Sequence, residues 1–301
     1  MSASTPPPAA TAPDAPGLAL RVGFIGLGNM GAGMARNVRA AGVETVVYDT
    51  RAEAVAELTD LGATAAAHSG EACLGVEVLC VAVFDETQVR AALLGDATGP
   101  GALTTAAPGT VIAIHSTVSA AFVRELADIA MRQDVHVIDV AMTGGGDVAA
   151  RAGTLTFMVG GPTRAVQRCR PVLDLMASNV FHVGETGAGV SAKIVNNFLA
   201  TSNVALVREA LAIARGCGFD ESLLEVIGAG GVGSSWVSNN WDRIRAQEET
   251  YTTGREGMAR MWAKDLALAA GLAGQHDVPT PIADFLIEHI VPEVGAQGLT
   301  G

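Results

Sequence analysis

One stretch near the start of the chain decides the fold. It reads Leu20-Arg21-Val22-Gly23-Phe24-Ile25 and continues as Gly26-Leu27-Gly28-Asn29-Met30-Gly31. The first half is a short apolar run typical of a buried strand, and the glycines lead into a helical pattern. Gly-x-Gly-x-x-Gly at such a junction is the dinucleotide fingerprint, because its glycines permit a tight turn, a close approach of the pyrophosphate and tight helix–strand packing. We expect the phosphates at the helix N-terminus, where free N–H groups favour negative charge.

An acidic residue stands where this motif needs one. Asp49 ends the second expected strand, 23 residues after Gly26, and is the expected acceptor for a ribose hydroxyl. Capping of the next helix is its alternative role. A carboxylate here repels the extra phosphate of NADP and favours NAD, whereas Arg51, two residues further on, has a guanidinium that can accommodate that phosphate.

Alternating strand and helix patterns continue from this motif to Gly184. Strands are expected at 43–48, 78–84, 110–114, 135–140, 154–159 and 180–183, with helices such as 51–61, 120–132 and 163–176 between them. This alternation predicts an α/β fold, a doubly wound parallel sheet covered on both faces.

Strand signals stop after Gly184. Residues 187–216 are apolar on most helical faces, so we expect this helix to be buried between domains or subunits. The Pro, Ala and Ser content of residues 1–19 is typical of a disordered tail. We therefore expect a tail at 1–19, a Rossmann domain at 20–184 and an all-α domain at 185–301.

Composition excludes several classes of function. The chain has 301 residues with 19 basic and 31 acidic side chains, a net charge of −12, which argues against a nucleic-acid partner. Mean hydropathy is +0.34, yet no apolar run approaches the ~18 residues of a membrane span. The first 18 residues lack Lys, Arg and an apolar core, unlike a secretory or transit peptide. The four cysteines have no metal-type spacing, so we expect a reducing, cytoplasmic location and no metal site.

Further polar residues lie where chemistry is possible. Thr143-Gly144-Gly145-Gly146 follows a strand at the carboxyl end of the expected sheet, where it is either a flexible turn or a cradle for a carboxylate. Lys193 and Asn197 share a helix face. The Lys193 amine either reaches solvent or is desolvated, which lowers its pKa and suits proton transfer. Lys264 is a second cation in an apolar helix, and its neighbour Asp265 is not expected to pair with it because adjacent residues on a helix diverge.

Taken in order, these motifs resemble the β-hydroxyacid dehydrogenase family, which includes 3-hydroxyisobutyrate dehydrogenase and tartronate semialdehyde reductase. The resemblance covers about residues 20–290. It rests on the glycine motif, Ser116-Thr117, 139–145 with the Gly-Thr-Leu that follows, 187–197 and 264–266.

The resemblance implies a role for each matching residue. Lys193 would be the catalytic acid/base, Asn197 would orient the substrate, Thr143, Gly144 and Gly145 would hold its carboxylate, and Lys264 would close the site. Trp236 and Asn239 fall in a stretch that resembles a pocket-lining segment, although ordinary core or interface packing is the alternative for the tryptophan. The residues implied at the cofactor are Gly26, Gly28, Asn29, Met30, Gly31, Asp49, Arg51, Thr117 and Lys264. Family members pair through the helical domain, which implies a homodimer or homotetramer.

The substrate loop departs from the family pattern Asp-Ala-Pro-Val-Ser-Gly-Gly. Val140, Ala141, Met142 and Thr143 replace the second to fifth residues, so the particular acid is not carried over. We expect an NAD-dependent oxidoreductase that transfers hydride between nicotinamide and the β-carbon hydroxyl of a small carboxylate-bearing substrate.

Three other functions are alternatives to this expectation. Imine reductases of this fold carry Asp or Tyr in place of Lys193 and tend towards NADP, so Lys193 and Asp49 count against that activity. A non-catalytic dinucleotide-binding interaction protein would lose the lysine. A 6-phosphogluconate dehydrogenase would need a longer helical domain.

Overall fold

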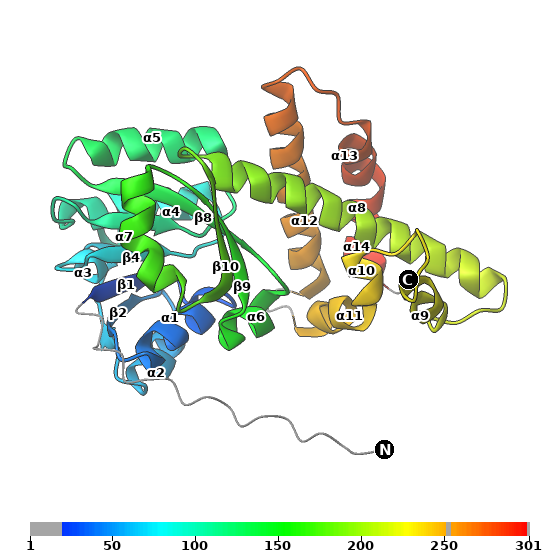
Figure 1. Cartoon of the computed structure of the whole chain (residues 1–301), viewed down its shortest axis with the longest axis horizontal. Coiled ribbons are helices and arrows are strands. Elements are labelled where there is room, and N and C mark those ends of the chain that lie inside the picture. The colour runs from blue at the N-terminus through cyan, green and yellow to red at the C-terminus, as the bar shows by residue number, and fades with distance from the viewer. Residues whose placement is uncertain (1–19, 251–253, 300–301) are drawn as a thin grey trace, which may run out of the picture.

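The structure is a computed structural model that describes residues 20–250 and 254–299. The expected tail at 1–19 lies outside the described residues. The seven strands that the sequence predicts are all present, and the structure adds three strands of two residues each. Strands and helices alternate up to Gly184, and the described residues beyond it contain helices only (Figure 1). This order matches the predicted α/β fold followed by an all-α region.

Eight strands form one sheet, in the order β10-β9-β8-β7-β4-β1-β2-β3. Apolar side chains bury the central strands on both faces, which is why they read as continuous apolar runs. The strands are β1 (Arg21–Ile25), β2 (Glu44–Tyr48), β3 (Thr64–Ala65), β4 (Val78–Val81), β7 (Val111–Ile114), β8 (His136–Thr143), β9 (Leu155–Gly160) and β10 (Ala177–Gly184).

One pair of strands departs from the expected parallel sheet. β8 and β9 are antiparallel, whereas the other neighbouring pairs of this sheet are parallel. The connection between them contains only the seven-residue helix α6 (Gly146–Ala152). A parallel return needs a crossover of about a dozen residues or more, so the chain turns back beside β8 instead.

Helices cover both faces of the sheet, as a doubly wound fold requires. One apolar core lies under α1 (Gly31–Ala40), α2 (Ala52–Thr59), α6 and α7 (Thr163–Leu173). The other lies under α3 (Ser69–Cys73), α4 (Glu86–Leu94), the 3₁₀ turn η1 (Ala102–Thr104) and α5 (Ala120–Met131). Between α4 and η1 the two-residue strands β5 (Gly95–Asp96) and β6 (Gly99–Pro100) pair as a small hairpin.

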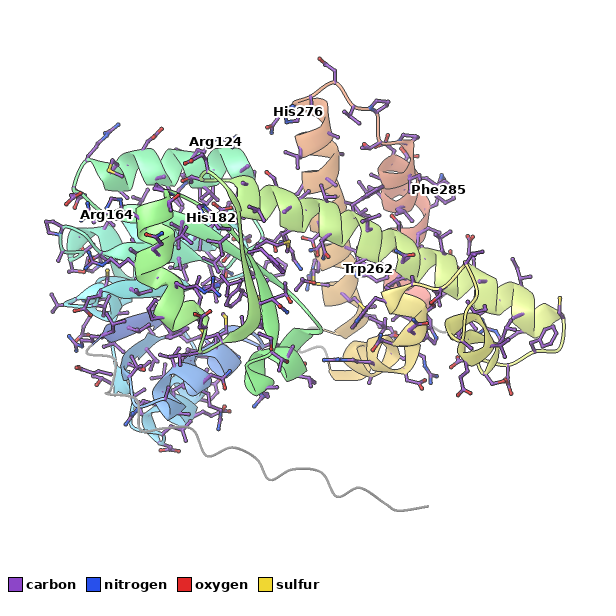
Figure 2. The ribbon with its side chains drawn as sticks, in the orientation of Figure 1. Arg124, Arg164, His182, Trp262, His276 and Phe285 are labelled. Carbon is purple, nitrogen blue, oxygen red and sulfur yellow. The ribbon has the colours of Figure 1, made fainter. Side chains whose placement is uncertain are left out.

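The helical region is organised around α8 (Ala188–Gly216), a helix of 29 residues. It leaves the sheet beside β8 and β9 and crosses α12 (Figure 1). A separate apolar core joins it to the later helices, and Trp262 (Figure 2) is one of its buried side chains. These helices are α9 (Leu223–Gly228), α10 (Trp236–Asn239), α11 (Trp241–Thr250), α12 (Gly254–Gly274), α13 (Pro281–Phe285), the π-helical turn η2 (Leu286–Ile290) and α14 (Val291–Gln297).

One face of α8 is not buried within the chain. Leu199, Leu206 and Ile213 are spaced by seven residues and are 56%, 63% and 70% exposed. The all-round apolar pattern therefore reflects contacts inside the chain on one side and an open apolar stripe on the other. No helix among the described residues is long and apolar enough to cross a membrane.

Candidate active site

The glycine fingerprint forms the turn between β1 and α1. Gly26 has φ +89°, a left-handed conformation that glycine adopts without strain. A Cβ on Gly31 would collide with the Gly26 carbonyl group, so these two glycines let the helix pack on the turn. A Cβ on Gly28 would meet nothing within 4 Å, which leaves open space for a pyrophosphate. Asn29, exposed, and Met30, half-buried, lie at the start of α1.

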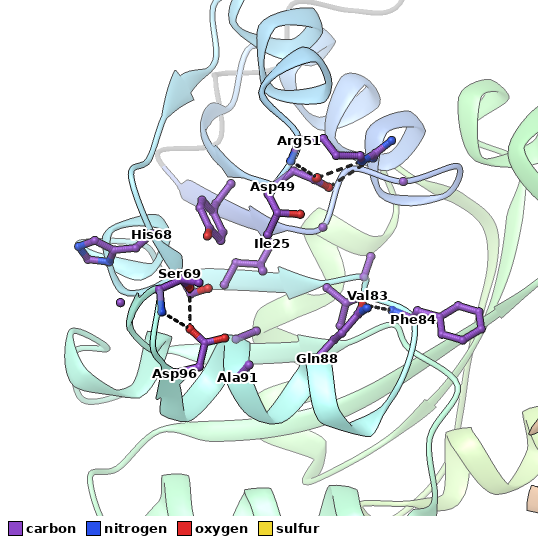
Figure 3. Close-up of a pocket in the computed structure, with 18 of the residues that line it drawn as sticks. Ile25, Asp49, Arg51, His68, Ser69, Val83, Phe84, Gln88, Ala91 and Asp96 are labelled. Carbon is purple, nitrogen blue, oxygen red and sulfur yellow. Dashed lines mark hydrogen bonds and ion pairs between the residues drawn. The ribbon is translucent and has the colours of Figure 1, made fainter. Parts of the chain in front are cut away.

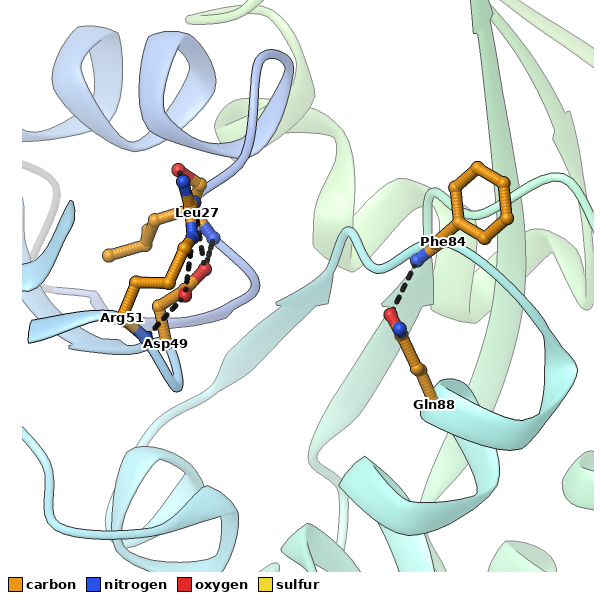
Figure 4. A network of polar contacts seen from close by, with 5 residues as sticks. All are labelled: Leu27, Asp49, Arg51, Phe84 and Gln88. Carbon is orange, nitrogen blue, oxygen red and sulfur yellow. Dashed lines mark hydrogen bonds and ion pairs between the residues drawn. The ribbon is translucent and has the colours of Figure 1, made fainter. Parts of the chain in front are cut away.

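Asp49 is held against this turn by hydrogen bonds. Its carboxylate accepts the Leu27 N–H at 2.6 Å and the Arg51 N–H at 2.9 Å (Figure 4). Burial alone would raise the pKa of Asp49, but these hydrogen bonds and the Arg51 guanidinium lower it. The carboxylate is therefore ionised at neutral pH.

Arg51 is engaged by the same group. Its Nε lies 3.2 Å from Asp49 Oδ1, and an Nη donates to the Leu27 carbonyl at 3.1 Å (Figure 4). The Arg51 guanidinium, which the sequence offers as a partner for the extra phosphate of NADP, is thus paired with the Asp49 carboxylate instead.

A cleft of about 390 Å³ extends from this turn along the carboxyl ends of β1, β2 and β4 (Figure 3). Gly26, Gly28, Asp49 and Arg51 line it, in agreement with the expected place of ligands in open α/β sheets. Asp96 of the small hairpin closes its far end, and no sequence signal predicted that residue.

The candidate catalytic side chains lie at the junction of α8, α12 and the sheet domain. Asn197 Nδ2 donates to Asp265 Oδ2 at 2.7 Å. The Lys264 ammonium lies 3.2 Å from Asp265 Oδ1 and donates to the Thr117 carbonyl at 2.9 Å. Asp265, buried, therefore joins the two helices, and its pairing with Lys264 overturns the expectation that adjacent residues would diverge.

Lys193, also on α8, is half-buried and lies close enough to Asp265 and Lys264 for their charges to act on its amine. Burial lowers its pKa to about 8; the charge of Asp265 opposes this shift and that of Lys264 reinforces it. Among the described residues, no hydrogen bond to its amine is found. The amine therefore titrates near physiological pH and is free to contact a ligand.

The substrate loop adjoins the cluster through Asn196. Thr143, at the end of β8, lies with its hydroxyl 3.5 Å from Asn196 Nδ2, which also donates to Asn197 Oδ1 at 3.2 Å. Gly144 and Gly145 follow with φ of +117° and +111°. On the other side of this loop, an Nη of Arg243 in α11 donates to the Gly145 carbonyl at 2.7 Å.

Within the part of the chain that the structure describes, neither of the two predicted selectivity residues forms a hydrogen bond or an ion pair with this cluster. Trp236 begins α10 and is 50% exposed. Asn239 is exposed, and its side-chain oxygen accepts from Ser234 Oγ at 3.1 Å.

Besides Asp96 in the cleft, sequence reasoning missed four residues that contact or support the cluster and the substrate loop: Asp139, Asn196, Arg243 and Asp265. One feature of the sequence does indicate this site. The chain has only two lysines, Lys193 and Lys264, and both are candidate site residues. Cations elsewhere are arginines, which stay protonated, whereas a lysine amine can be tuned to lose its proton. No cluster of three or more potential metal ligands occurs in the part of the chain that the structure describes.

Two family models together match most of the chain. Residues 21–184 match the model for the NAD binding domain of 6-phosphogluconate dehydrogenase, and residues 187–300 match the model for NAD-binding of NADP-dependent 3-hydroxyisobutyrate dehydrogenase. The chain belongs to the β-hydroxyacid dehydrogenase family. It is therefore a nicotinamide-dependent oxidoreductase of the 3-hydroxyisobutyrate dehydrogenase type, acting on CH–OH groups.

Individual relatives of this β-hydroxyacid dehydrogenase cover most of its length. A 3-hydroxyisobutyrate dehydrogenase of Pseudomonas aeruginosa is 35% identical over 87% of this chain and 88% of its own. An NAD-dependent L-serine dehydrogenase of the same organism is 34% identical over 89% and 90%. The crystal structure of 3-hydroxyisobutyrate dehydrogenase from Salmonella typhimurium superposes with a TM-score of 0.79 at 31% identity, over 93% and 95%. Imine reductases share the fold at 20% identity or less.

Proposed function

We propose that this dehydrogenase oxidises the β-hydroxyl of a small hydroxy acid with NAD, with Lys193 as general base. The single observation that carries the proposal is the Lys193 amine, with its pKa lowered to about 8, beside the Asn197–Asp265 pair. A general base works best with a pKa near the operating pH.

Each site residue then has a defined task in oxidation. Thr143, Gly144 and Gly145 bind the substrate carboxylate, and Asn197 orients the hydroxyl. The neutral Lys193 amine accepts the hydroxyl proton while a hydride leaves the carbon that bears this hydroxyl. A bound NAD would supply the acceptor for that hydride. In reduction the Lys193 ammonium returns the proton and stabilises the developing oxyanion.

The cofactor contacts follow the sheet edge. Gly26, Gly28, Asn29, Met30 and Gly31 would surround the pyrophosphate, and Thr117 and Lys264 would border the nicotinamide end. We propose NAD over NADP because Asp49 is ionised and Arg51 is paired to it. Trp236 and Asn239 would act on substrate choice if ligand binding brings α10 closer.

The proposal extends to domains, assembly and location. Residues 20–184 would form the cofactor domain and 185–301 the substrate and assembly domain. The open stripe of α8 supports a homodimer or homotetramer, since an exposed apolar row of this kind usually marks an interface. Three free, buried cysteines, Cys73, Cys80 and Cys169, support a reducing, cytoplasmic location.

The test is NAD reduction by the purified protein across small β-hydroxy acids such as 3-hydroxyisobutyrate and L-serine. Cyclic imines with NADPH would be assayed in parallel. We expect turnover of at least one hydroxy acid, and Lys193→Arg should lower kcat by about 10²–10⁴-fold with NAD affinity unchanged. Near-normal turnover of that variant, or activity on imines alone, would refute the proposal.

A further inference from the structure

Arg243 of α11 reaches across to the loop that follows β8. Besides the 2.7 Å hydrogen bond to the Gly145 carbonyl, its guanidinium occupies the space that a side chain on Gly145 would fill. A Cβ added to Gly145 would stand 2.7 Å from the guanidinium carbon. The side chain is half-buried, so this contact places a cation, partly shielded from water, against the loop.

Most donors of this guanidinium have no partner in the described residues. One Nη donates to Gly145, and no carboxylate among those residues forms an ion pair with it. Arg245, two residues further along α11, is different, because it pairs with Asp242 at 2.8 Å and Glu221 at 3.3 Å. Arg243 therefore offers a planar fork of N–H groups, the arrangement that matches a carboxylate.

We propose that Arg243 is a substrate-binding residue whose guanidinium takes the substrate carboxylate beside Gly145. The inference rests on the proposed function and deepens it, because it requires an anionic carboxylate at this end of the substrate. Backbone N–H groups and the Thr143 hydroxyl supply dipoles there, whereas Arg243 supplies a full charge. In a chain with a net charge of −12, such a charge offsets the repulsion of an anionic substrate.

The proposal also assigns α11 a role in specificity. Arg243 joins the helical region to the substrate loop, so the acid would bind between the two parts of the chain. Hydrogen bonds to charged groups are worth enough to change affinity by about 10–100-fold. A neutral ester or amide of the same size gains nothing from the guanidinium and should be discriminated against.

The decisive experiment compares a hydroxy acid with its methyl ester in wild type and in Arg243→Gln. Gln retains a donor for the Gly145 carbonyl while removing the charge, and Arg243→Lys retains the charge without the fork. Arg245→Gln removes a charge from the same helix away from the loop and is the matched control. Thermal unfolding of each variant checks the fold.

We expect Arg243→Gln to lower kcat/KM for the acid about 10–100-fold, mainly through KM, and to change the ester less than about threefold. For Arg243→Lys, kcat/KM for the acid should lie between the values for wild type and Arg243→Gln. The control Arg245→Gln should behave as wild type. An equal loss for acid and ester would show that Arg243 only supports the loop, and would overturn the inference.

A binding measurement separates this inference from the proposed function. Isobutyrate and isobutyramide, neither of which has a hydroxyl to oxidise, are titrated calorimetrically into the protein saturated with NAD. If no hydroxy acid is oxidised but Arg243→Gln abolishes the preference for isobutyrate, the anion site stands and the proposed function fails. If hydroxy acids are oxidised and the preference is the same in both proteins, the proposed function stands and the Arg243 site fails.

Discussion

The buried carboxylate of Asp139 accepts the backbone N–H of Val190 at 2.8 Å. Its other oxygen accepts the N–H of Gly187 at 2.7 Å. Asp139 lies in β8, four residues before Thr143, and Val190 lies in α8, three residues before Lys193. One carboxylate thus fixes the substrate loop and the helix that carries the proposed base in a single arrangement. Burial raises the pKa of Asp139, and the backbone N–H groups oppose that shift.

Replacing this carboxylate should weaken the fold at the junction. In Asp139→Asn one oxygen becomes an NH₂ group that faces an N–H, so one hydrogen bond is lost between buried groups. We expect the free energy of unfolding to fall by about 1–3 kcal/mol and kcat to fall as Lys193 shifts. Urea unfolding measures the first effect, with exposed Asp128→Asn as control. An unfolding free energy within about 0.5 kcal/mol of wild type would contradict this role.

The pH dependence should report the titration of Lys193. With a pKa near 8, the amine is increasingly neutral above pH 8, so the rate of oxidation should rise through that pH. The rate of reduction should fall over the same range, since it needs the ammonium. Asp265→Asn removes the charge that raises this pKa, and should move both midpoints to lower pH.

The scarcity of lysine makes the titration directly observable. Reductive methylation with ¹³C-formaldehyde should yield two lysine signals besides that of the N-terminal amine. Lys264→Arg leaves one lysine signal, that of Lys193, which is assigned by its loss in Lys193→Arg. We expect the Lys193 signal to titrate near pH 8. A midpoint near the ordinary lysine value of about 10.4 would show that the amine is not desolvated.

Cofactor choice should depend on the Asp49–Arg51 pair. Asp49→Ser removes the negative charge and releases Arg51, which then has its guanidinium available to a 2′-phosphate. We expect the ratio of kcat/KM for NAD to that for NADP to fall by about 10-fold or more, the equivalent of ~1.4 kcal/mol. Arg51→Ala, which keeps the carboxylate, should not favour NADP. An unchanged ratio in Asp49→Ser would place selectivity elsewhere in the cleft.

Self-association should depend on the open stripe of α8. Leu206 is at its centre, and Leu206→Glu places a charge where an apolar contact is expected. We expect sedimentation velocity to show a smaller species for this variant than for wild type, with helical content retained by circular dichroism. Exposed Glu57→Gln, in the sheet domain, is the control. The same mass for wild type and variant would remove the stripe from the interface.

The local pattern of the sequence determined the elements and the cofactor motif. Strand and helix periodicity, the glycine fingerprint and Asp49 are each encoded within a few residues, so they predicted β1, α1 and the turn between them. The same local reasoning erred for β9, because the direction of a strand depends on whether its connection crosses the sheet. It also misjudged Asp265, since the long Lys264 side chain bends towards its neighbour.

Only the tertiary structure decided which polar groups of distant residues form hydrogen bonds with each other. Asp139 and Val190 are 51 residues apart, Asn197 and Asp265 are 68 apart, and Gly145 and Arg243 are 98 apart. No periodicity links residues at such separations, because their approach depends on the angle at which α8 and α11 pack against the sheet domain. The sequence by itself determined that Lys193 stands on an apolar helix. Its pKa and its neighbours follow from burial and charge, which only the packed chain defines.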